Sequence, residues 1–315
     1  MCNKTFTLSP VDPLTLPVLF SSDYGYYTGA KIYRGQFDGK AATSANITAQ
    51  CGDAAGFSAW LNGDFVGSYI GNDTEAAGSA LLDFRDATLH ETNNVLTVLA
   101  DFTGFDQTSV RPAGGENPRG ILGAWMYRND NDTLDFSEWR IQGNAGGDAN
   151  IDPVRGPMNE DGLYGTRLGW HLPGYQPSEA SIPTSPLDGL NASGLHWYIS
   201  HFSLDLDANL DVPIGLKLEA PENVAASVQI YMNGYQYGKY MPHLGPQTRF
   251  PFPPGVINNR GNNTLAVSLW AQTEKGARLT RAELFAYNAF QTGFDFDQDW
   301  GYLQLGWDEG RLQYA

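Results

Sequence analysis

The densest run of potential metal ligands in this chain is an acidic stretch, and the chemistry it could do is calcium binding. Asp205, Asp207 and Asp211 are spaced like the first ligands of a calcium loop, whose carboxylate oxygens coordinate the ion. Such a loop also needs Gly at its sixth position and Glu at its twelfth, where this chain has Leu210 and Leu216. The histidines lack metal-ligand spacing as well; they are His90, His171, His196, His201 and His243. We therefore predict no metal and no cofactor.

Covalent catalysis has no recognisable nucleophile in this sequence. There is no Gly-x-Ser-x-Gly elbow and no Cys–His pairing that would activate a thiol. The glycine-rich run 143–147 is followed by neither Lys-Ser/Thr nor a helix signal, so it is not a phosphate cradle. The formal net charge of −16 repels phosphate backbones and anionic lipid, and no apolar run is long enough to span a membrane. The sequence therefore predicts neither a nucleic-acid partner nor a membrane partner.

Aromatic residues outside the predicted cores suggest carbohydrate binding. Sugar sites stack pyranose rings on aromatic faces, while amides and charged groups bind the hydroxyls. Trp170, His171 and Tyr175 lie in a Pro-rich segment, and Tyr235 and Tyr237 share one face of a predicted strand. We predict these five as candidate carbohydrate-binding residues. The alternative is that they pack against the linker or against a neighbouring domain.

The elements that must position these residues are strands, and their pattern occurs twice. Residues 228–232 alternate between apolar and polar, as in a half-buried strand, and Asn233-Gly234 supplies a two-residue hairpin turn. Residues 57–61 and Asn62-Gly63 repeat this unit, 171 residues earlier (233 minus 62). A later strand that opens with Asn-Asn recurs at an offset of 169 (262 minus 93). The near-equal offsets predict one β-domain present twice.

Length and composition agree with two β-domains. The chain has 315 residues, 42% of them hydrophobic, with 36 Gly and 18 Pro for turns, and helix signals are nearly absent; the clearest, at 76–84, predicts one short turn. We predict an all-β fold of two tandem antiparallel jelly-roll sandwiches. The predicted parts are an irregular lead (1–20), a first jelly roll (21–142), a Gly/Pro-rich linker (143–186), a second jelly roll (187–290) and a tail (291–315).

Several motifs resemble the C-terminal end of large fungal β-galactosidases of glycoside hydrolase family 35. The run from Arg155 to His171 resembles the linker ahead of the last domain of those enzymes, and the run from Tyr231 to Tyr240 resembles a hairpin within that domain. Ser21 to Tyr26 and Pro118 to Leu122 resemble the domain before it. The resemblance covers roughly residues 15 to 290 and implies that the two sandwich domains are of the galactose-binding-domain-like kind.

The resemblance also implies what this chain lacks. The family carries two catalytic glutamates in an N-terminal TIM-type barrel, and retaining glycosidases place such carboxyls about 5–5.5 Å apart. This chain has no βαβ alternation and hence no such barrel. Asn159-Glu160 and Glu116-Asn117 are only superficially similar to the acid-bearing dipeptide of related barrels, so no residue is predicted to be catalytic. The chain alone is predicted to be inactive.

The implied function is the non-catalytic C-terminal portion of a secreted β-galactosidase, which hydrolyses terminal non-reducing β-D-galactose residues. These domains would brace the missing catalytic barrel and contact carbohydrate. The alternative is a free-standing galactoside-binding, lectin-like module. The expected partners are therefore a β-galactoside or other carbohydrate and the barrel domain.

Secretion is an expectation taken from the family. Met1 to Thr5 lead into no apolar run of signal-peptide length, but several sequons suit a glycosylating pathway. One disulfide, between Cys2 and Cys51, is possible; two unrelated thiols are the alternative. The candidate N-glycosylation sites are Asn3, Asn46, Asn72, Asn131, Asn191 and Asn262.

Overall fold

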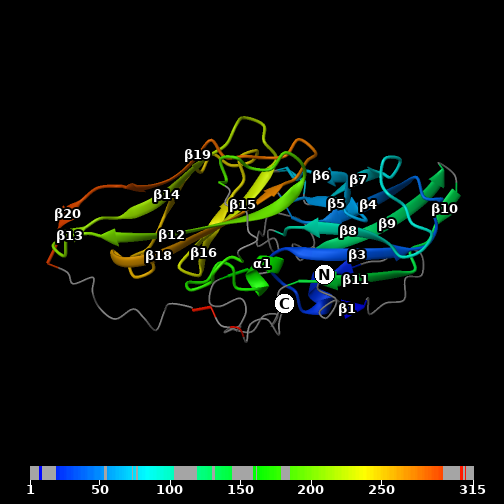
Figure 1. Ribbon diagram of the computed structural model, residues 1–315. Helices are drawn as coiled ribbons and strands as arrows, with labels where there is room; N and C mark the ends of the chain where they lie inside the picture. Colours follow the sequence, from blue (N-terminus) through cyan, green and yellow to red (C-terminus); the bar gives the residue numbers. More distant parts are fainter. Residues whose placement is uncertain are drawn as a thin grey trace, which may run out of the picture. The chain divides into compact units, whose positions relative to one another are not determined.

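Short segments of alternating apolar and polar residues form antiparallel strands throughout the chain (Figure 1). The computed structural model describes residues 7–8, 19–52, 55–72, 74–75, 77–102, 119–129, 132–143, 159–160, 162–178, 185–293, 306–307 and 309. The chain divides into two compact units, the first formed mainly by residues up to 152 and the second mainly by residues from 165 onward. No helix among these described residues could cross a membrane, because α1 (Tyr164–Arg167) is a single turn.

The first unit is built from two antiparallel sheets. One sheet has the order β1-β11-β3-β8-β5-β6, and the other has the order β10-β9-β4-β7 with β2 on β9. A 3-10 turn, η1 (Ser21–Tyr24), follows β2. The strands are β1 (Thr7–Leu8), β2 (Leu19–Phe20), β3 (Lys31–Phe37), β4 (Ser44–Gln50), β5 (Phe57–Leu61), β6 (Asp64–Tyr69), β7 (Ala77–Asp83), β8 (Asn94–Ala100), β9 (Gly120–Asn129), β10 (Asp132–Leu134) and β11 (Glu138–Gln142).

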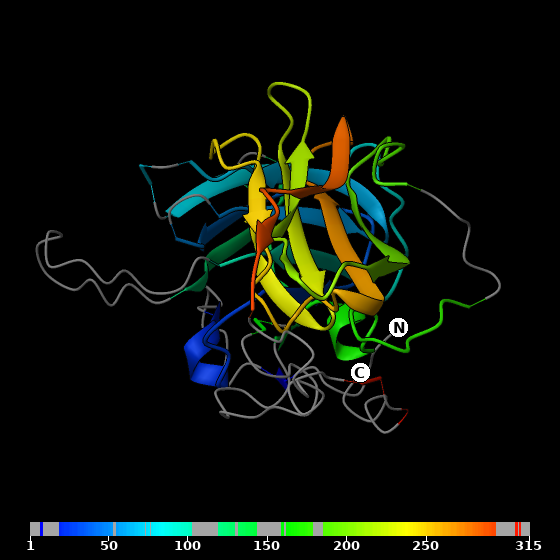
Figure 2. The same cartoon turned by 90° about the vertical axis from the view of Figure 1, so that its left-hand side faces the viewer.

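The second unit repeats this arrangement (Figure 2). Its four-stranded sheet has the order β12-β18-β15-β16 and its three-stranded sheet β17-β14-β19, while β13 pairs with β20. The strands are β12 (Gly194–Asp205), β13 (Leu210–Asp211), β14 (Ile214–Glu219), β15 (Ala226–Met232), β16 (Tyr235–Tyr240), β17 (Arg249–Pro251), β18 (Arg260–Ala271), β19 (Arg281–Ala286) and β20 (Phe290–Gln291).

The predicted all-β fold is confirmed, and the strand orders of the two units correspond. The order β12-β18-β15-β16 matches β3-β8-β5-β6 strand for strand, and β17-β14-β19 matches β7-β4-β9. Both hairpins carry a register shift, between Ala59 and Trp60 and between Ile230 and Tyr231. These shifts are again 171 residues apart (230 minus 59), so even the irregularity of the sheet repeats.

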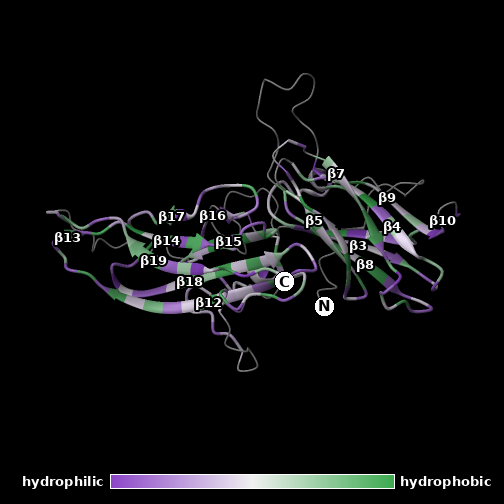
Figure 3. Cartoon of the chain, turned by 90° about the horizontal axis from the view of Figure 1, so that it is seen from above, coloured by the Kyte–Doolittle hydropathy of each residue, from purple (hydrophilic) through white to green (hydrophobic). Residues whose placement is uncertain are grey.

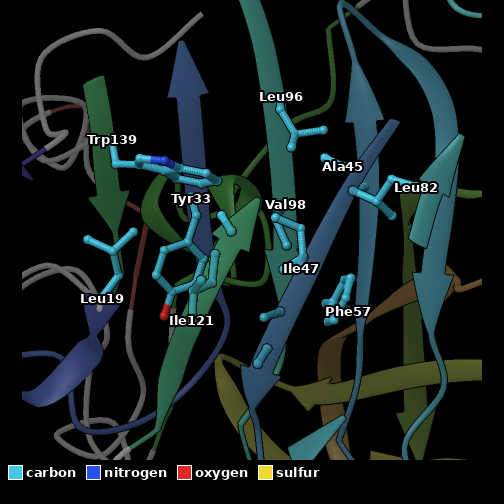
Figure 4. Packing of buried hydrophobic residues seen from close by; sticks show 14 of the residues in the cluster. Leu19, Tyr33, Ala45, Ile47, Phe57, Leu82, Leu96, Val98, Ile121 and Trp139 are labelled. Atoms are coloured by element: carbon cyan, nitrogen blue, oxygen red, sulfur yellow. The ribbon is translucent and has the colours of Figure 1, made fainter. Parts of the chain in front are cut away.

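Each unit has its own hydrophobic core, and the period of the strands creates it. Hydropathy alternates along the longer strands (Figure 3), which turns every second side chain inward. In the first unit, Tyr33 of β3 and Phe57 of β5 face Ile47 of β4 and Ile121 of β9 across the sandwich (Figure 4). All four side chains are fully buried. Burying a side chain of this size contributes about 1.5–3 kcal/mol, so the two-sheet packing stabilises the unit.

Asparagines at the two hairpins explain the repeated sequence motif. Asn233 has a left-handed backbone, with φ of 49°, as a tight hairpin turn requires. Its Nδ2 donates to the carbonyl oxygen of Val256 (2.6 Å) and to Oδ1 of Asn263 (2.8 Å), and its Oδ1 accepts from the amide of Thr264 (2.8 Å). The turn is thereby fastened to the adjoining strand β18.

The first unit has the same fastening. Asn62, with φ of 52°, donates from Nδ2 to the carbonyl oxygen of Thr88 (2.7 Å) and to Oδ1 of Asn94 (2.8 Å). Its Oδ1 accepts from the amide of Val95 (2.9 Å). We call each set of contacts an Asn clamp. The Asn-Gly and Asn-Asn motifs are therefore the two halves of one structural device.

Candidate functional site

The aromatic residues predicted from the linker gather on one sheet of the second unit. Trp170 contacts Trp197 of β12 edge-to-face, with ring centroids 6.1 Å apart. His171 lies over Tyr231 of β15 at 4.9 Å, and Tyr231 lies 5.3 Å from Trp197. Tyr175 joins Trp170 at 6.2 Å. We call these five residues, together with Trp307, which lies 6.2 Å from Tyr175, the linker cluster.

The linker cluster covers the part of the outer face of the four-stranded sheet that carries Trp197 and Tyr231. On β15, Val228 and Ile230 point into the core, so Gln229 and Tyr231 must point to the opposite face. Every residue of β15 is nevertheless buried. The linker lies against Tyr231 on that outer face.

Small residues let the linker approach so closely. A Cβ atom on Gly165 would lie 2.5 Å from the Trp197 indole and 2.6 Å from the Trp170 ring. The chain then turns at Gly169 (φ of 73°), while the amide of Trp170 donates to the carbonyl oxygen of Gly165 at 2.9 Å. Trp307 donates from Nε1 to the carbonyl oxygen of Leu168 at 3.1 Å. Local sequence therefore shapes a segment that docks on its own domain.

Burial defines what the linker cluster can do chemically. His171 and Tyr231 are both 0% exposed, and the Tyr231 hydroxyl donates to Oε1 of Gln229 at 2.5 Å. A ligand could not reach them without removing the linker from the sheet. Trp170 and Tyr175 are partly exposed, but each packs against two other rings. The cluster is thus built for packing, and carbohydrate contact by its members stays a prediction.

Tyr235 and Tyr237 of β16 lie in different surroundings. Gln236 is paired with Tyr231 and Gly238 with Ile230, so Tyr237 is the extra residue of a β-bulge. Tyr237 packs edge-to-face on Phe252 at 5.3 Å beside the second core, and burial raises the pKa of its hydroxyl to about 12. Burial also raises the pKa of Tyr235. The bulge is the reason that simple alternation does not describe this strand.

Asn159, the first residue of the Asn159-Glu160 dipeptide, makes structural contacts in the second unit. Asn159 is buried; its Nδ2 donates to the carbonyl oxygen of Gly234 (2.7 Å) and its Oδ1 accepts from the amide of Gln236 (2.7 Å). This half of the Asn159-Glu160 dipeptide therefore braces the β15–β16 hairpin. Glu116 and Asn117 lie outside the described residues. No three His, Cys, Asp or Glu side chains gather as a metal site among the residues that can be described.

The candidate modification sites differ in their surroundings. Asn191 and Asn262 are exposed, whereas Asn46 is half-buried in β4. The Oδ1 of Asn72 accepts from the Thr74 hydroxyl of its own sequon at 2.8 Å. Asn3 and Asn131 lie outside the described residues.

The cysteine pair is only half described. Cys51 is fully buried, and burial raises the pKa of its thiol to about 12. Cys2 lies outside the described residues, so a bridge between the two stays a prediction.

Comparison with known protein families gives a match to two stretches of the chain. The sequence model of the beta-galactosidase second all-beta domain matches residues 1–106 and 164–275. Each stretch contains one complete Asn clamp.

The chain is also similar from end to end to curated fungal proteins. It is 62% identical over all 315 residues to a probable beta-galactosidase C of Penicillium rubens and 58% identical to one of Aspergillus fumigatus. The chain spans about a third of the length of these relatives, 32% in each case.

Solved structures show only distant likeness. A Pleurotus ostreatus lectin aligns over 92% of this chain and 90% of its own length, with 12% identity and a TM-score of 0.23. A GH78 family rhamnosidase of Bacillus sp. GL1 aligns over 85% of this chain and 33% of its own, with 15% identity and a TM-score of 0.29. Scores this low carry no inference about function.

Proposed function

Because this chain belongs to the family of the beta-galactosidase second all-beta domain, we propose that it acts as the non-catalytic, bracing portion of a larger β-galactosidase. The observation that carries this proposal is the combination of 57–62% identity along the entire chain with coverage of only 32% of the relatives' length. The whole enzyme is proposed to be secreted and to hydrolyse terminal non-reducing β-D-galactose residues. The sandwiches would hold its catalytic domain in place.

A row of three side chains on the first unit, Trp125, Asn46 and Leu81, supports the bracing role. Asn46 in the middle strand β4 is paired with Trp125 of β9 on one side and with Leu81 of β7 on the other. Directly paired residues share a face of the sheet, and Leu81 is 69% exposed. The indole of Trp125 lies along the sheet, because a Cβ on Gly123 would be only 2.4 Å from it. A flat surface of this kind suits a protein partner.

Bracing through this row and glycosylation of Asn46 exclude each other. A glycan attached to Asn46 would project from the middle of the proposed contact face. Bracing through this face therefore requires that Asn46 carries no glycan in the assembled enzyme.

One substitution tests the bracing role. Leu81→Asp in the full-length enzyme should lower its melting temperature by several degrees, because a charge at a covered apolar contact loses its hydration. The matched control is the same substitution in the 315-residue chain alone, where Leu81 is exposed and stability should hardly change. An equal effect in both proteins, or none in either, would contradict a contact at this face.

The non-catalytic role has a separate test. The 315-residue chain is incubated with a chromogenic β-galactoside, and no turnover is expected. Turnover that a single Glu substitution within the chain abolishes would overturn the proposal.

A further inference from the structure

A pocket of about 550 Å³ opens in the second unit, away from the residues of the linker cluster. Three segments far apart in sequence line it: the stretch before β12, the β14–β15 loop and the β18–β19 loop. Its polar lining residues are Asp188, Asn191, Glu222, Asn223, Thr273, Lys275 and Arg278. The volume falls within the range of small-molecule sites, about 300–1,000 Å³, and suits one or two pyranose rings.

The backbone holds two of these segments together. Leu190 and Ala277 exchange both hydrogen bonds, at 2.8 and 2.9 Å. Gly189 and Gly276 flank this bridge with left-handed φ angles of 67° and 71°. A Cβ on Gly276 would lie 1.9 Å from the Leu190 carbonyl oxygen, and one on Gly189 would lie 2.3 Å from that of Ala277. Only glycine permits this approach, so the floor of the pocket is formed before any ligand arrives.

The walls combine hydrogen-bond donors and acceptors, and their positive and negative side chains are equal in number. Asp188 and Glu222 contribute two negative charges, and Lys275 and Arg278 contribute two positive ones. This balance is unusual in a chain of net charge −16. Within the described part of the protein, Glu222, Lys275 and Arg278 form no ion pair with one another or with other residues. Their hydrogen-bonding capacity is available to a ligand.

These features define the class of ligand. Because the two carboxylates and the two cations balance, the lining gives no net attraction for a phosphate or for a polyamine. A neutral polyhydroxyl compound can use both, because each sugar hydroxyl donates one hydrogen bond and accepts others. Asn191 and Asn223 add amides with the same double capacity. We propose that this pocket binds the hydroxyl groups of a saccharide.

Two sources could supply that saccharide. One is a free β-galactoside, and the other is the chain's own glycan on Asn191, which lines the pocket and begins the sequon Asn191-Ala192-Ser193. The inference rests on the carbohydrate contact expected of a β-galactosidase portion, and it does not depend on the bracing role.

The free-ligand arm uses the 315-residue chain produced in bacteria, which carries no glycan. Galactose and lactose are titrated while backbone amide resonances of the pocket loops are followed by NMR. Millimolar binding is expected, and Glu222→Gln and Arg278→Gln should each weaken it about tenfold, because each removes a charge-assisted hydrogen bond. Glu274→Gln is the matched control, since Glu274 is exposed on the same loop but does not line the pocket, and binding should be unchanged.

The glycan arm uses the chain from a glycosylating host. If the Asn191 glycan fills the pocket, the glycosylated protein should show shifted pocket resonances and no binding of added lactose. Ser193→Ala, which removes the sequon but keeps Asn191, should restore the spectrum and the binding of the bacterial protein. Circular dichroism checks its fold, because the Ser193 hydroxyl donates to the Ala271 carbonyl oxygen at 2.9 Å.

The proposal is overturned if two results occur together. Galactose and lactose do not shift the pocket resonances even at saturating concentrations, and glycosylation at Asn191 does not shift them either. It is also overturned if Glu274→Gln weakens binding as much as the pocket variants do. Neither result would bear on bracing, because Glu222→Gln and Arg278→Gln are expected to leave the melting temperature of the full-length enzyme unchanged.

Discussion

Asn233 shows how a single side chain can specify a turn, and its removal gives a first prediction. Asn233→Ala leaves the Thr264 amide and the Val256 carbonyl without their partner and places alanine in the left-handed region. Buried groups that lose a partner cost about 1–3 kcal/mol, and the backbone strain costs about 1 kcal/mol more. We expect the free energy of unfolding of the second unit to fall by about 2–4 kcal/mol in urea titrations.

A matched control separates the clamp from asparagine loss in general. Asn288 is exposed, and its Oδ1 accepts only from the adjacent amide of Ala289. Asn288→Ala should therefore change stability by less than about 0.5 kcal/mol. Equal effects of the two substitutions would show that the clamp is not what stabilises the hairpin.

Cys51 supports a second prediction at the residue scale. Because burial raises the pKa of the thiol to about 12, only about one molecule in ten thousand carries the thiolate at pH 8. Iodoacetamide should therefore modify native, reduced protein far more slowly than protein unfolded in urea, as measured by mass spectrometry. Rapid modification of native protein would contradict this burial. Resistance that persists in urea and is lost with reductant would instead support the bridge to Cys2.

The pH dependence of stability follows from the same shift. The folded-state pKa of Cys51 lies above its ordinary value of 9.0, so folded protein retains a proton that unfolded protein releases. The contribution of this thiol to stability is complete below pH 9 and is lost as the pH rises toward 12. Cys51→Ala should reduce the loss of stability in that window.

The linker is the element for which the structure differs most from the prediction: its aromatic residues were predicted to bind carbohydrate, and in the structure they pack on the second unit. Trp170 packs on Trp197 and Tyr175, and its neighbour His171 lies over Tyr231 on the outer face of the β12-β18-β15-β16 sheet. Trp170→Ala should destabilise the second unit by about 2–4 kcal/mol, because a large ring is lost from a packed surface. Chemical denaturation followed by tryptophan fluorescence would measure it.

The control for the linker prediction is an exposed apolar residue of the same unit. Leu187 is 43% exposed, and Leu187→Ala should have little effect on unfolding. If Trp170→Ala leaves stability intact but weakens the binding of added galactosides, the linker cluster is a carbohydrate site after all, and the packing interpretation fails.

Net charge governs the behaviour of the whole molecule. With 35 acidic and 19 basic residues, the folded chain repels itself at neutral pH, and its described ion pairs are mostly solvent-exposed and contribute little. Raising NaCl from about 20 mM to about 500 mM shortens the screening length to a few ångströms. The melting temperature should rise by a few degrees in calorimetry. A fall would mean that attractive ion pairs dominate.

Local pattern was enough for much of the architecture. Alternation at residues 228–232 and the Asn-Gly turns indicated strands and hairpins, because the period of a strand and the φ > 0 of a tight turn are local properties. The repeated offsets indicated the duplication, and the matching strand orders confirm it. The short helical turn predicted at 76–84 was wrong: Ala77–Asp83 is strand β7, held by pairing with β4. Ala, Gly and Ser have little preference for strands, so the partner decides their conformation.

Sequence alone thus determined the β class, the two repeats and the hairpin positions, all of which depend on neighbours within a few residues. Tertiary structure alone decided that His171 is buried under the linker, that Tyr237 is the extra residue of a bulge, and that loops nearly a hundred residues apart line one pocket. These outcomes depend on which distant segments meet. No local spacing encodes that choice, because the free energy that settles it comes from surfaces buried only after the chain has folded.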